Sequence, residues 1–93
     1  MKLQITHDQD DLRFYASLDQ EEAELTYFVT EDNVLDFDYT FVPENYRNQG
    51  LADQLVETAL RYVKENNLKF TPSCPVVEAY ANRHPEYQEF MVL

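Results

Sequence analysis

A strand, a turn and an amphipathic helix follow one another between residues 34 and 63, and this order restricts the fold more than any other stretch. Residues 34–42 are rich in β-branched and aromatic side chains, as strands are, and a turn opens at Pro43. The turn contains Gly50, the only glycine of the 93 residues. Apolar residues then recur at helical spacing: Leu51, Ala52, Leu55, Val56, Ala59, Leu60 and Val63. We therefore expect the N-terminus of a helix to lie at the end of a strand.

A helix N-terminus in this position favours an anion. The amides of the first turn have no intrahelical acceptor, and the helix dipole is positive at this end. A lone glycine before a helix is, however, also typical of an ordinary turn that leads into a core helix. On these features alone the ordinary turn is the more frequent explanation.

The spacing of the residues around the glycine distinguishes the two explanations. The motif Arg47-x-x-Gly50-x-Ala52, directly after a strand and Val42-Pro43, resembles the acetyl-CoA pyrophosphate loop of the GNAT superfamily of N-acetyltransferases. Other segments look, in order, like the small single-domain GNAT-like family: Gly50-Leu51-Ala52, Leu55-Val56, Ala59-Leu60, Pro72-x-Cys74-Pro75, Tyr80 and Arg83-His84-Pro85-Glu86-Tyr87. The resemblance covers about half of the chain, from Thr40 to Tyr87, and implies a GNAT-like fold with an acetyltransferase activity.

The remaining sequence predicts a single domain over residues 1–93, of mixed α+β class. Alternating side chains and short links predict an antiparallel meander of four strands, at residues 2–6, 12–18, 23–30 and 34–42. We expect turns at residues 7–11 and 19–21, and a hairpin connection at 31–33. The turn at residues 7–11 contains a histidine and three aspartates, but it lacks the glycine and closing glutamate of a calcium loop, so no metal site is predicted.

The second half of the chain predicts a strand–helix–strand crossover. In the fourth strand, alternation places Leu35, Phe37, Tyr39 and Phe41 on one face and Asp36, Asp38 and Thr40 on the other. A helix from residue 50 to about 66 and a short strand at 68–71 imply a parallel partner for the fourth strand. A short second helix is expected at 76–82, stopped by Pro85, and the tail at 87–93 is expected to pack as a turn or strand.

The charge and the cysteine content restrict the partners. A net charge of −11 opposes binding to nucleic acid or to an anionic membrane, and is compatible with a cationic acceptor such as an amine or a Lys-bearing peptide. High solubility is the simpler explanation of the same charge. The chain has one cysteine, no apolar run of transmembrane length and no signal-peptide pattern, so we expect a reducing, cytoplasmic location.

The resemblance also implies roles for particular residues. Phe41 and Val42 would meet the pantetheine arm of acetyl-CoA, and backbone amides of Asn48, Gln49, Gly50, Leu51 and Ala52 would face its pyrophosphate. Arg47 at the edge of the loop, together with Arg83, would offset the negative charge of the ligand. We expect Gly50 at the close approach of backbone and phosphate, where a Cβ would collide.

Catalytic roles are expected for two further residues. Tyr80 falls where the superfamily often places a tyrosine acid, and a packed core aromatic is an equally good interpretation. Cys74 lies near the expected thioester position, either as an acyl-accepting nucleophile or as a small buried residue beside the ligand. His84 is expected to be structural. Family members often carry a histidine just before the position of Thr40, and this chain has Tyr39, so Asp38 or a water molecule would have to act as the base.

Three functions are compatible with this pattern. The first is an acetyl-CoA-dependent N-acetyltransferase that acts by direct attack of an unidentified amine, with an open acceptor site suited to a protein or peptide. The second is a CoA or acyl-CoA binding protein without catalysis, which the missing histidine favours. The third is an acidic interaction domain that has lost the ligand, and the intact Arg47-x-x-Gly50-x-Ala52 motif argues against it.

Overall fold

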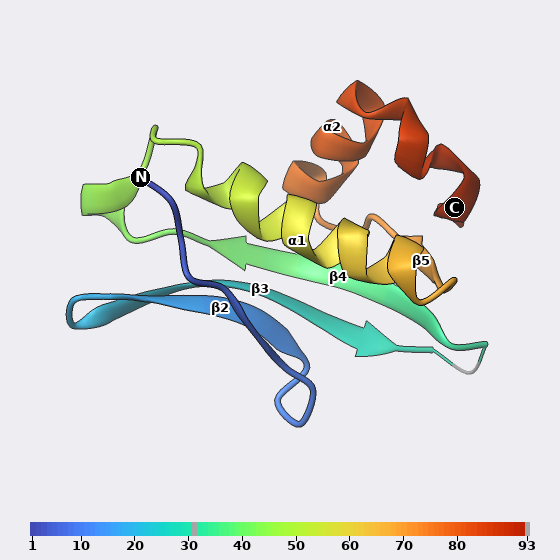
Figure 1. Ribbon diagram of the computed structural model, residues 1–93, viewed down its shortest axis with the longest axis horizontal. Helices are drawn as coiled ribbons and strands as arrows, with labels where there is room; N and C mark the ends of the chain where they lie inside the picture. The colour runs from blue at the N-terminus through green and yellow to red at the C-terminus, as the bar shows by residue number, and fades with distance from the viewer. Residues whose placement is uncertain (31, 93) are drawn as a thin grey trace.

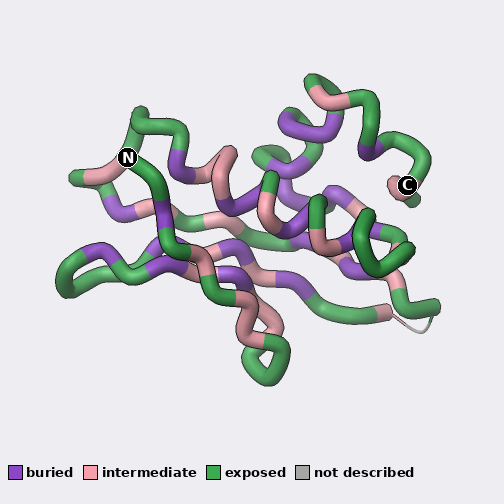
Figure 2. The backbone as a smooth tube through the Cα atoms, viewed as in Figure 1, coloured by how far each residue is buried: buried purple, intermediate pink, exposed green. Residues whose placement is uncertain are grey.

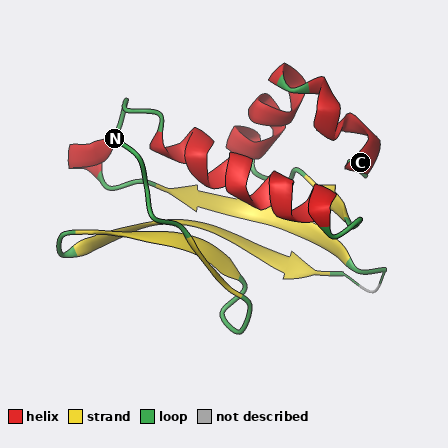
Figure 3. Ribbon diagram, viewed as in Figure 1, coloured by secondary structure: helices red, strands yellow, loops and turns green. Residues whose placement is uncertain are grey.

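The computed structural model describes residues 1–30 and 32–92, and Figure 1 shows its helices gathered on one side of a sheet. The strands are β1 (Thr6–Asp8), β2 (Arg13–Leu18), β3 (Glu21–Val29), β4 (Val34–Phe41) and β5 (Lys69–Thr71). The helices are α1 (Leu51–Glu65) and α2 (Pro75–Arg83), with 3-10 turns η1 (Glu44–Tyr46) and η2 (Pro85–Phe90). Figure 3 marks these helices and strands by colour.

The strands lie in the sheet in the order of the sequence, β1-β2-β3-β4-β5. The first three pairings are antiparallel, whereas β4 and β5 pair in parallel across the α1 crossover. The predicted antiparallel meander, followed by a parallel strand and a short C-terminal helix, is therefore confirmed. The crossover brings the start of α1 to the C-terminal end of β4, as the strand–turn–helix order requires.

The core lies between α1 and the sheet. Buried and exposed residues alternate along the strands, as Figure 2 shows, because successive side chains point to opposite faces. The covered face contributes Phe14, Leu25 and Phe37, all at most 1% exposed. The buried face of α1 consists of Leu51, Leu55, Val56, Ala59, Leu60 and Val63, which includes all but one of the residues that the sequence pattern identified. None of the helices within the described ranges has the length and apolar character needed to cross a membrane.

The prediction of a first strand at residues 2–6 is wrong. Strand β1 begins at Thr6 and includes His7 and Asp8, which were expected in a turn. The preceding residues instead lie against α1, where the Leu3 amide donates to Gln54 Oε1 (2.8 Å) and the Leu3 side chain is buried. The apolar alternation there reflects packing against a helix rather than pairing in a sheet.

The predicted faces of the fourth strand are correct up to Phe37 and wrong beyond it. Tyr27 lies opposite Phe37, but the preceding Thr26 lies opposite Tyr39, so Asp38 is an extra residue in β4. Such a β-bulge reverses the alternation that follows it. Tyr39 and Phe41 therefore lie on the uncovered face, 49% and 36% exposed, whereas Leu35 and Phe37 are buried.

The other boundaries agree with the sequence to within a few residues. The predicted connection 31–33 starts at residue 31, outside the described residues, while Asn33 has the expected positive φ of 59°. Helix α1 ends at Glu65, before Asn66 and Asn67, and α2 ends before Pro85. The tail forms the turn η2 and then a bridge between Phe70 and Met91, and residue 93 lies outside the described residues.

Candidate functional site

The loop between β4 and α1 has the backbone conformation of an anion site. Gly50 caps α1 with φ +75°, in the left-handed region that glycine tolerates best, and Asn48 also has a positive φ of 65°. The first intrahelical bond of α1 runs from the Gln54 amide to the Gly50 carbonyl (3.2 Å). No side chain among residues 1–30 and 32–92 caps the helix, so within these ranges the amides of Leu51, Ala52 and Asp53 have neither an intrahelical nor a capping acceptor.

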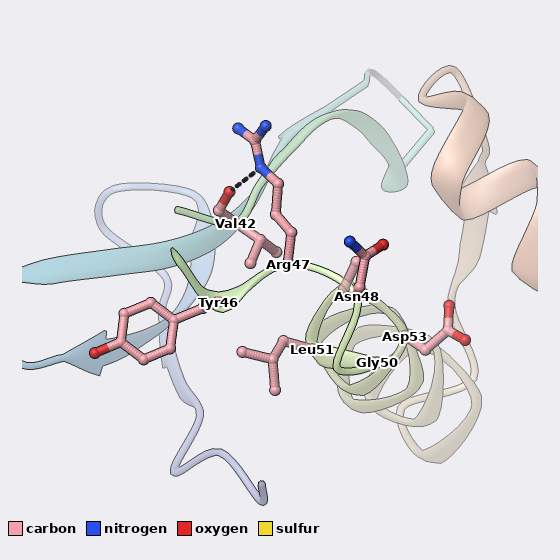
Figure 4. A pocket seen from close by; sticks show the side chains of 8 residues that line it. Val42, Tyr46, Arg47, Asn48, Gly50, Leu51 and Asp53 are labelled. Carbon is pink, nitrogen blue, oxygen red and sulfur yellow. Dashed lines mark hydrogen bonds between the residues drawn. The ribbon is translucent and has the colours of Figure 1, made fainter. Parts of the chain in front are cut away.

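A cavity of about 200 Å³ lies in front of these amides. Figure 4 shows the residues that line it: Val42, Tyr46, Arg47, Asn48, Gly50, Leu51, Ala52 and Asp53. A Cβ added at Gly50 would meet no atom within 4 Å, so the space beside this glycine is open. The positive φ alone accounts for glycine in the free protein, and a close approach of phosphate at the open space stays a prediction. The uncapped amides and the open space fit an oxygen-rich anionic group such as a pyrophosphate.

Arg47 connects the loop to the end of β4. Its Nε atom donates to the Val42 carbonyl at 2.8 Å, and Figure 4 shows the guanidinium beside this carbonyl. Within the described residues, its two Nη atoms make no hydrogen bond, and the Val42 amide has no acceptor. The end of β4 therefore has one charged and one neutral donor without an acceptor among the described residues.

Arg83 reaches the same region from α2. Its Nη2 atom lies 3.2 Å from Oδ1 of Asp53, a residue in the first turn of α1 that also lines the cavity. A carboxylate in the first turn stabilises the helix dipole but opposes a bound anion. Arg83 offsets that carboxylate, and the 56% exposure of its side chain leaves it accessible to a ligand. The two positive charges of Arg47 and Arg83 therefore exceed the single negative charge of Asp53.

Strands β4 and β5 separate beyond residue 36. Their pairing covers Val34–Asp36 and Lys69–Thr71, and one more bond joins the Cys74 amide to the Phe37 carbonyl (2.8 Å). The Cys74 Sγ atom lies 3.3 Å from the Thr40 hydroxyl and its side chain is 5% exposed. Cys74 thus lies at the point of separation, as expected for a residue near a ligand between the strands. It also immediately precedes α2.

Tyr80 is buried and held by neighbouring side chains, rather than free to act as an acid. Its ring is 4% exposed and stacks on His84 with centroids 4.0 Å apart, and its hydroxyl donates to Glu57 Oε2 of α1 (3.4 Å). Burial, with the nearby charge of Glu57, raises the pKa of Tyr80 to about 12. Tyr80 therefore stays protonated at neutral pH and is a hydrogen-bond donor, while His84 ends α2 and packs, as a structural residue does.

The structure brings together most of the predicted site residues. Of the predicted set, the cavity is lined by Val42, Arg47, Asn48, Gly50, Leu51 and Ala52. Gln49 is exposed outside this lining, and the Phe41 side chain lies on the uncovered face of the sheet, so only its backbone faces the strand end. Cys74, Tyr80 and Arg83 are not among the residues that line the cavity.

Two cavity residues were not predicted. Asp53 is the first acidic residue of α1, and its place in the first turn is a signal that the sequence contains. Tyr46 lies in η1, and its hydroxyl donates to Asp19 Oδ2 in the β2–β3 turn (2.5 Å), which raises the pKa of Tyr46. This contact spans 27 residues, and no local pattern indicates it. Among residues 1–30 and 32–92, no cluster of three His, Cys, Asp or Glu side chains could hold a metal ion.

Known proteins share this arrangement. Residues 13–90 match the sequence model of a family described as GCN5-related N-acetyltransferase. The chain is 31% identical to Protein NATD1 of Gallus gallus over 85 residues, which cover 89% of this chain and 77% of that protein. It is 30% identical to Protein NATD1 of Danio rerio over 92 residues, covering 95% and 84% respectively.

A solved structure agrees with the sequence comparison. The NMR solution structure of a GCN5-like protein from Staphylococcus aureus superposes with a TM-score of 0.75 at 27% identity, covering 98% of this chain and 89% of that one. The similarity thus extends over the β4–α1 loop, the separated strands and α2. From its sequence, its fold and the geometry of this loop, the chain belongs to the GCN5-related N-acetyltransferase family.

Proposed function

We propose that this protein is an acetyl-CoA-dependent N-acetyltransferase, in which an amine attacks the acetyl group directly while both substrates are bound. The observation that carries the proposal is the cavity in front of the uncapped first turn of α1, bordered by Arg47. Free amides at a helix N-terminus bind phosphate oxygens through hydrogen bonds and the helix dipole. The family relationship supports acyl transfer as the chemistry.

The pyrophosphate would be held by the loop that ends at Gly50 and by the first turn of α1. Arg47 would add a charge-assisted hydrogen bond, because its two Nη atoms make no hydrogen bond within the described chain. The pantetheine arm would follow the end of β4, where β5 no longer pairs. Val42 would meet it through its amide, which has no acceptor among the described residues.

Bound acetyl-CoA supplies an activated acetyl thioester, and the chain must place donors and a base around it. The Val42 amide is suited to stabilise the oxygen that becomes negative during attack. The amine nitrogen bonds to the acetyl carbon as the carbon–sulfur bond breaks, and the proton lost by the amine balances the proton gained by sulfur. A free lysine amine has a pKa of about 10.4 and needs help to lose its proton. Asp38, at the bulge of β4, or a water molecule would accept it.

Tyr80 is the candidate that would protonate the sulfur. Its pKa of about 12 keeps it protonated, which suits a donor, but its hydroxyl donates to Glu57 in this structure. The side chain would have to leave Glu57 to reach the ligand. A CoA-binding protein without catalysis is therefore the second candidate, and the engagement of Tyr80 by Glu57 is the observation that favours it.

Titration of acetyl-CoA into the ¹⁵N-labelled protein tests the binding step. We expect saturable heat in calorimetry and amide shifts confined to residues 41–52 and 74–83. Arg47→Ala should weaken binding by roughly tenfold, the scale of one charged hydrogen bond. Lys64→Ala, which removes the same charge from the far end of α1, should leave the affinity unchanged. Absence of heat and shifts at millimolar ligand would leave only the acidic interaction domain.

Release of free CoA in the presence of amines then separates the first two functions. An acetyltransferase releases CoA in proportion to acetylated amine, and Tyr80→Phe lowers the rate while acetyl-CoA affinity stays the same. Binding of acetyl-CoA without release of CoA above the uncatalysed rate, across small amines and Lys-bearing peptides, would support the non-catalytic alternative.

The single cysteine supports a further proposal, that the protein works in the reducing cytoplasm.

A further inference from the structure

The uncovered face of the sheet carries an unusual group of side chains next to the bulge of β4. We name this group the acidic–aromatic patch and define it by six residues of β3 and β4: Thr26, Phe28, Asp36, Asp38, Tyr39 and Phe41. Register places Phe28 opposite Asp36 and Thr26 opposite Tyr39, so these side chains are neighbours on one face. The helices lie on the other face, as Figure 3 shows.

The carboxylates of the patch lack a cation. Neither Asp36 nor Asp38 forms an ion pair with any residue that the structure describes, and Asp38 Oδ1 accepts a bond from the Thr26 hydroxyl at 2.7 Å. Asp36 Oδ1 is shielded from solvent and has no hydrogen-bond partner. A carboxylate oxygen without a donor is unfavourable, and Asp36 as a whole is only partly buried, so a cation at the surface beside it would stabilise its charge.

Two other carboxylates, nearer to β2, do form ion pairs. Arg13 of β2 lies 2.9 Å from Glu22 and 3.1 Å from Glu24, both of β3. That arginine offsets one of the two glutamate charges and leaves a net charge of −1 beside the patch. Asp36 and Asp38 form no ion pair within the described residues, so the larger uncompensated charge of the face lies on β4, at the bulge.

Three aromatic side chains border these carboxylates and remain exposed. Phe28 is 47%, Tyr39 49% and Phe41 36% exposed. Aromatic rings attract cations through their faces and pack against the methylene groups of a lysine stem. Carboxylates among exposed rings are thus suited to a lysine side chain, which combines an apolar stem with a charged end.

The position of the patch relates it to the proposed reaction. Asp36 is the last residue of β4 that pairs with β5, and Tyr39 and Phe41 flank Thr40, whose hydroxyl contacts Cys74 at the point of separation. The cavity is lined by the first turn of α1 and the loop before it, and α1 lies on the covered face of the sheet. A ligand on the patch would approach the end of β4 from the uncovered face and leave that cavity free for the acetyl donor.

We propose that the acidic–aromatic patch docks the acceptor, and that the acceptor is a flexible peptide segment with several lysines. This inference rests on the proposed acetyltransferase function, because the patch is useful as an acceptor site only beside a bound acetyl donor. Complementary charge is the main argument, since the chain has a net charge of −11. A second copy of the chain would bring the unpaired carboxylates of both copies together and is disfavoured by their repulsion.

The test uses the full chain and a short peptide of lysine, glycine and serine with both ends blocked. The peptide is titrated into the ¹⁵N-labelled protein with and without saturating acetyl-CoA. We expect amide shifts at the patch residues of β3 and β4, and affinity that falls as salt is added. The same peptide with every lysine acetylated should cause no shifts.

A pair of matched variants identifies the surface. The double variant Asp36→Asn and Asp38→Asn should bind the peptide about tenfold more weakly, as expected for the loss of one exposed and one partly buried charge interaction. Its acetyl-CoA affinity should be unchanged. The control double variant Glu65→Gln and Glu78→Gln alters net charge equally on the exposed surfaces of α1 and α2, and should bind the peptide like the wild type.

Several results would overturn the proposal. Equal weakening by both double variants would mean that net charge, rather than the patch, attracts the peptide. Shifts elsewhere, absence of peptide binding by a protein that binds acetyl-CoA, or concentration-dependent shifts at the patch without peptide would each do the same. Titration of acetyl-CoA in the absence of peptide measures acetyl-CoA binding separately. Failure of that binding would overturn the proposed function even if the patch binds the lysine peptide.

Discussion

The two halves of β4 have the same kind of sequence and different surroundings. Residues 34–36 pair with β3 on one side and β5 on the other, and the adjoining Phe37 is fully buried. Residues 39–41 pair with β3 alone, and Tyr39 is half exposed. Asp38, the extra residue of the bulge, separates the halves.

This difference separates the residues that maintain the fold from those that border the candidate site. In the first half, the strand's hydrogen-bonding groups are used by its neighbours on both sides. Beyond the bulge one side has no neighbouring strand in the described part of the chain, so backbone groups such as the Val42 amide are available to a ligand. The same bulge turns Tyr39 and Phe41 away from the core, and this provides the exposed rings of the acidic–aromatic patch.

The largest contrast is expected from truncating one phenylalanine in each half. Phe37→Ala should destabilise the protein by about 3–5 kcal/mol, because it removes a fully buried ring and leaves a cavity. Phe41→Ala should cost about 1 kcal/mol or less, because its ring is partly exposed and no cavity forms. Urea denaturation of the two variants measures both values. Similar losses would mean that Phe41 is packed in the core and that the bulge is absent in solution.

The loop that follows the second half gives the next largest effect. Gly50→Val should lose acetyl-CoA binding and destabilise the protein by roughly 1–2 kcal/mol, because a β-branched residue is strained at φ +75°. Gly50→Asn separates strain from collision, since asparagine already occupies a positive φ at residue 48.

Calorimetry and denaturation of the asparagine variant decide between the two roles of Gly50. We expect near wild-type stability with weakened acetyl-CoA binding, because the added Cβ occupies open space where the phosphate would lie. Wild-type affinity in this variant would show that the glycine is needed only for its backbone conformation.

The sequence predicted the architecture well because its periodic segments are long. The alternation in β2 and β3 and the helical spacing in α1 were sufficient to predict the meander, the crossover and the buried face of α1. The family motif located the loop, and six of its predicted residues line the cavity. Local patterns sufficed because the backbone geometry of a strand or helix fixes which of its side chains share one face, and the apolar residues mark the face that is buried.

Failures of prediction occurred where a distant contact decides the structure. Leu3 and its neighbours alternate like a strand, but the Gln54 side chain, 51 residues away, holds that backbone against α1. The bulge at Asp38 depends on how β3 and β4 pair, and the alternation within β4 itself contains no sign of it. The contact of Tyr80 with Glu57 likewise depends on how α1 and α2 pack.

Cys74 gives a smaller effect that tests the mechanism. Cys74→Ala should destabilise the protein by about 1 kcal/mol, since it removes a small buried group and the contact with the Thr40 hydroxyl. Turnover should persist in this variant if the amine attacks acetyl-CoA directly. Complete loss of CoA release, together with an acetyl group found on Cys74 of the wild type by mass spectrometry, would instead establish a cysteine intermediate.

The smallest effect concerns pH and tests the side of the sheet that holds the first half of β4. On the covered face, the ring of Phe37 contacts those of Tyr27 and Phe14. His7 stacks on Phe14 with ring centroids 4.0 Å apart, and its Nε2 lies 2.5 Å from the Tyr27 hydroxyl. Burial lowers the pKa of His7 below its usual value, although the charge of Asp8 opposes this. The unfolded chain therefore binds more protons at this residue than the folded chain does.

The free energy of unfolding should consequently fall as the pH is lowered from neutral through about 6.5, the ordinary pKa of histidine. His7→Gln should remove this part of the pH dependence, which denaturation at a series of pH values measures as a difference from the wild type. Tyr27→Phe removes the hydrogen bond but keeps His7 buried, so it should retain the dependence. A wild-type slope in His7→Gln would contradict the burial of His7, whereas loss of the slope in Tyr27→Phe would assign the effect to the hydrogen bond. Because this cluster lies on the paired half of β4, acetyl-CoA affinity should be the same in both variants.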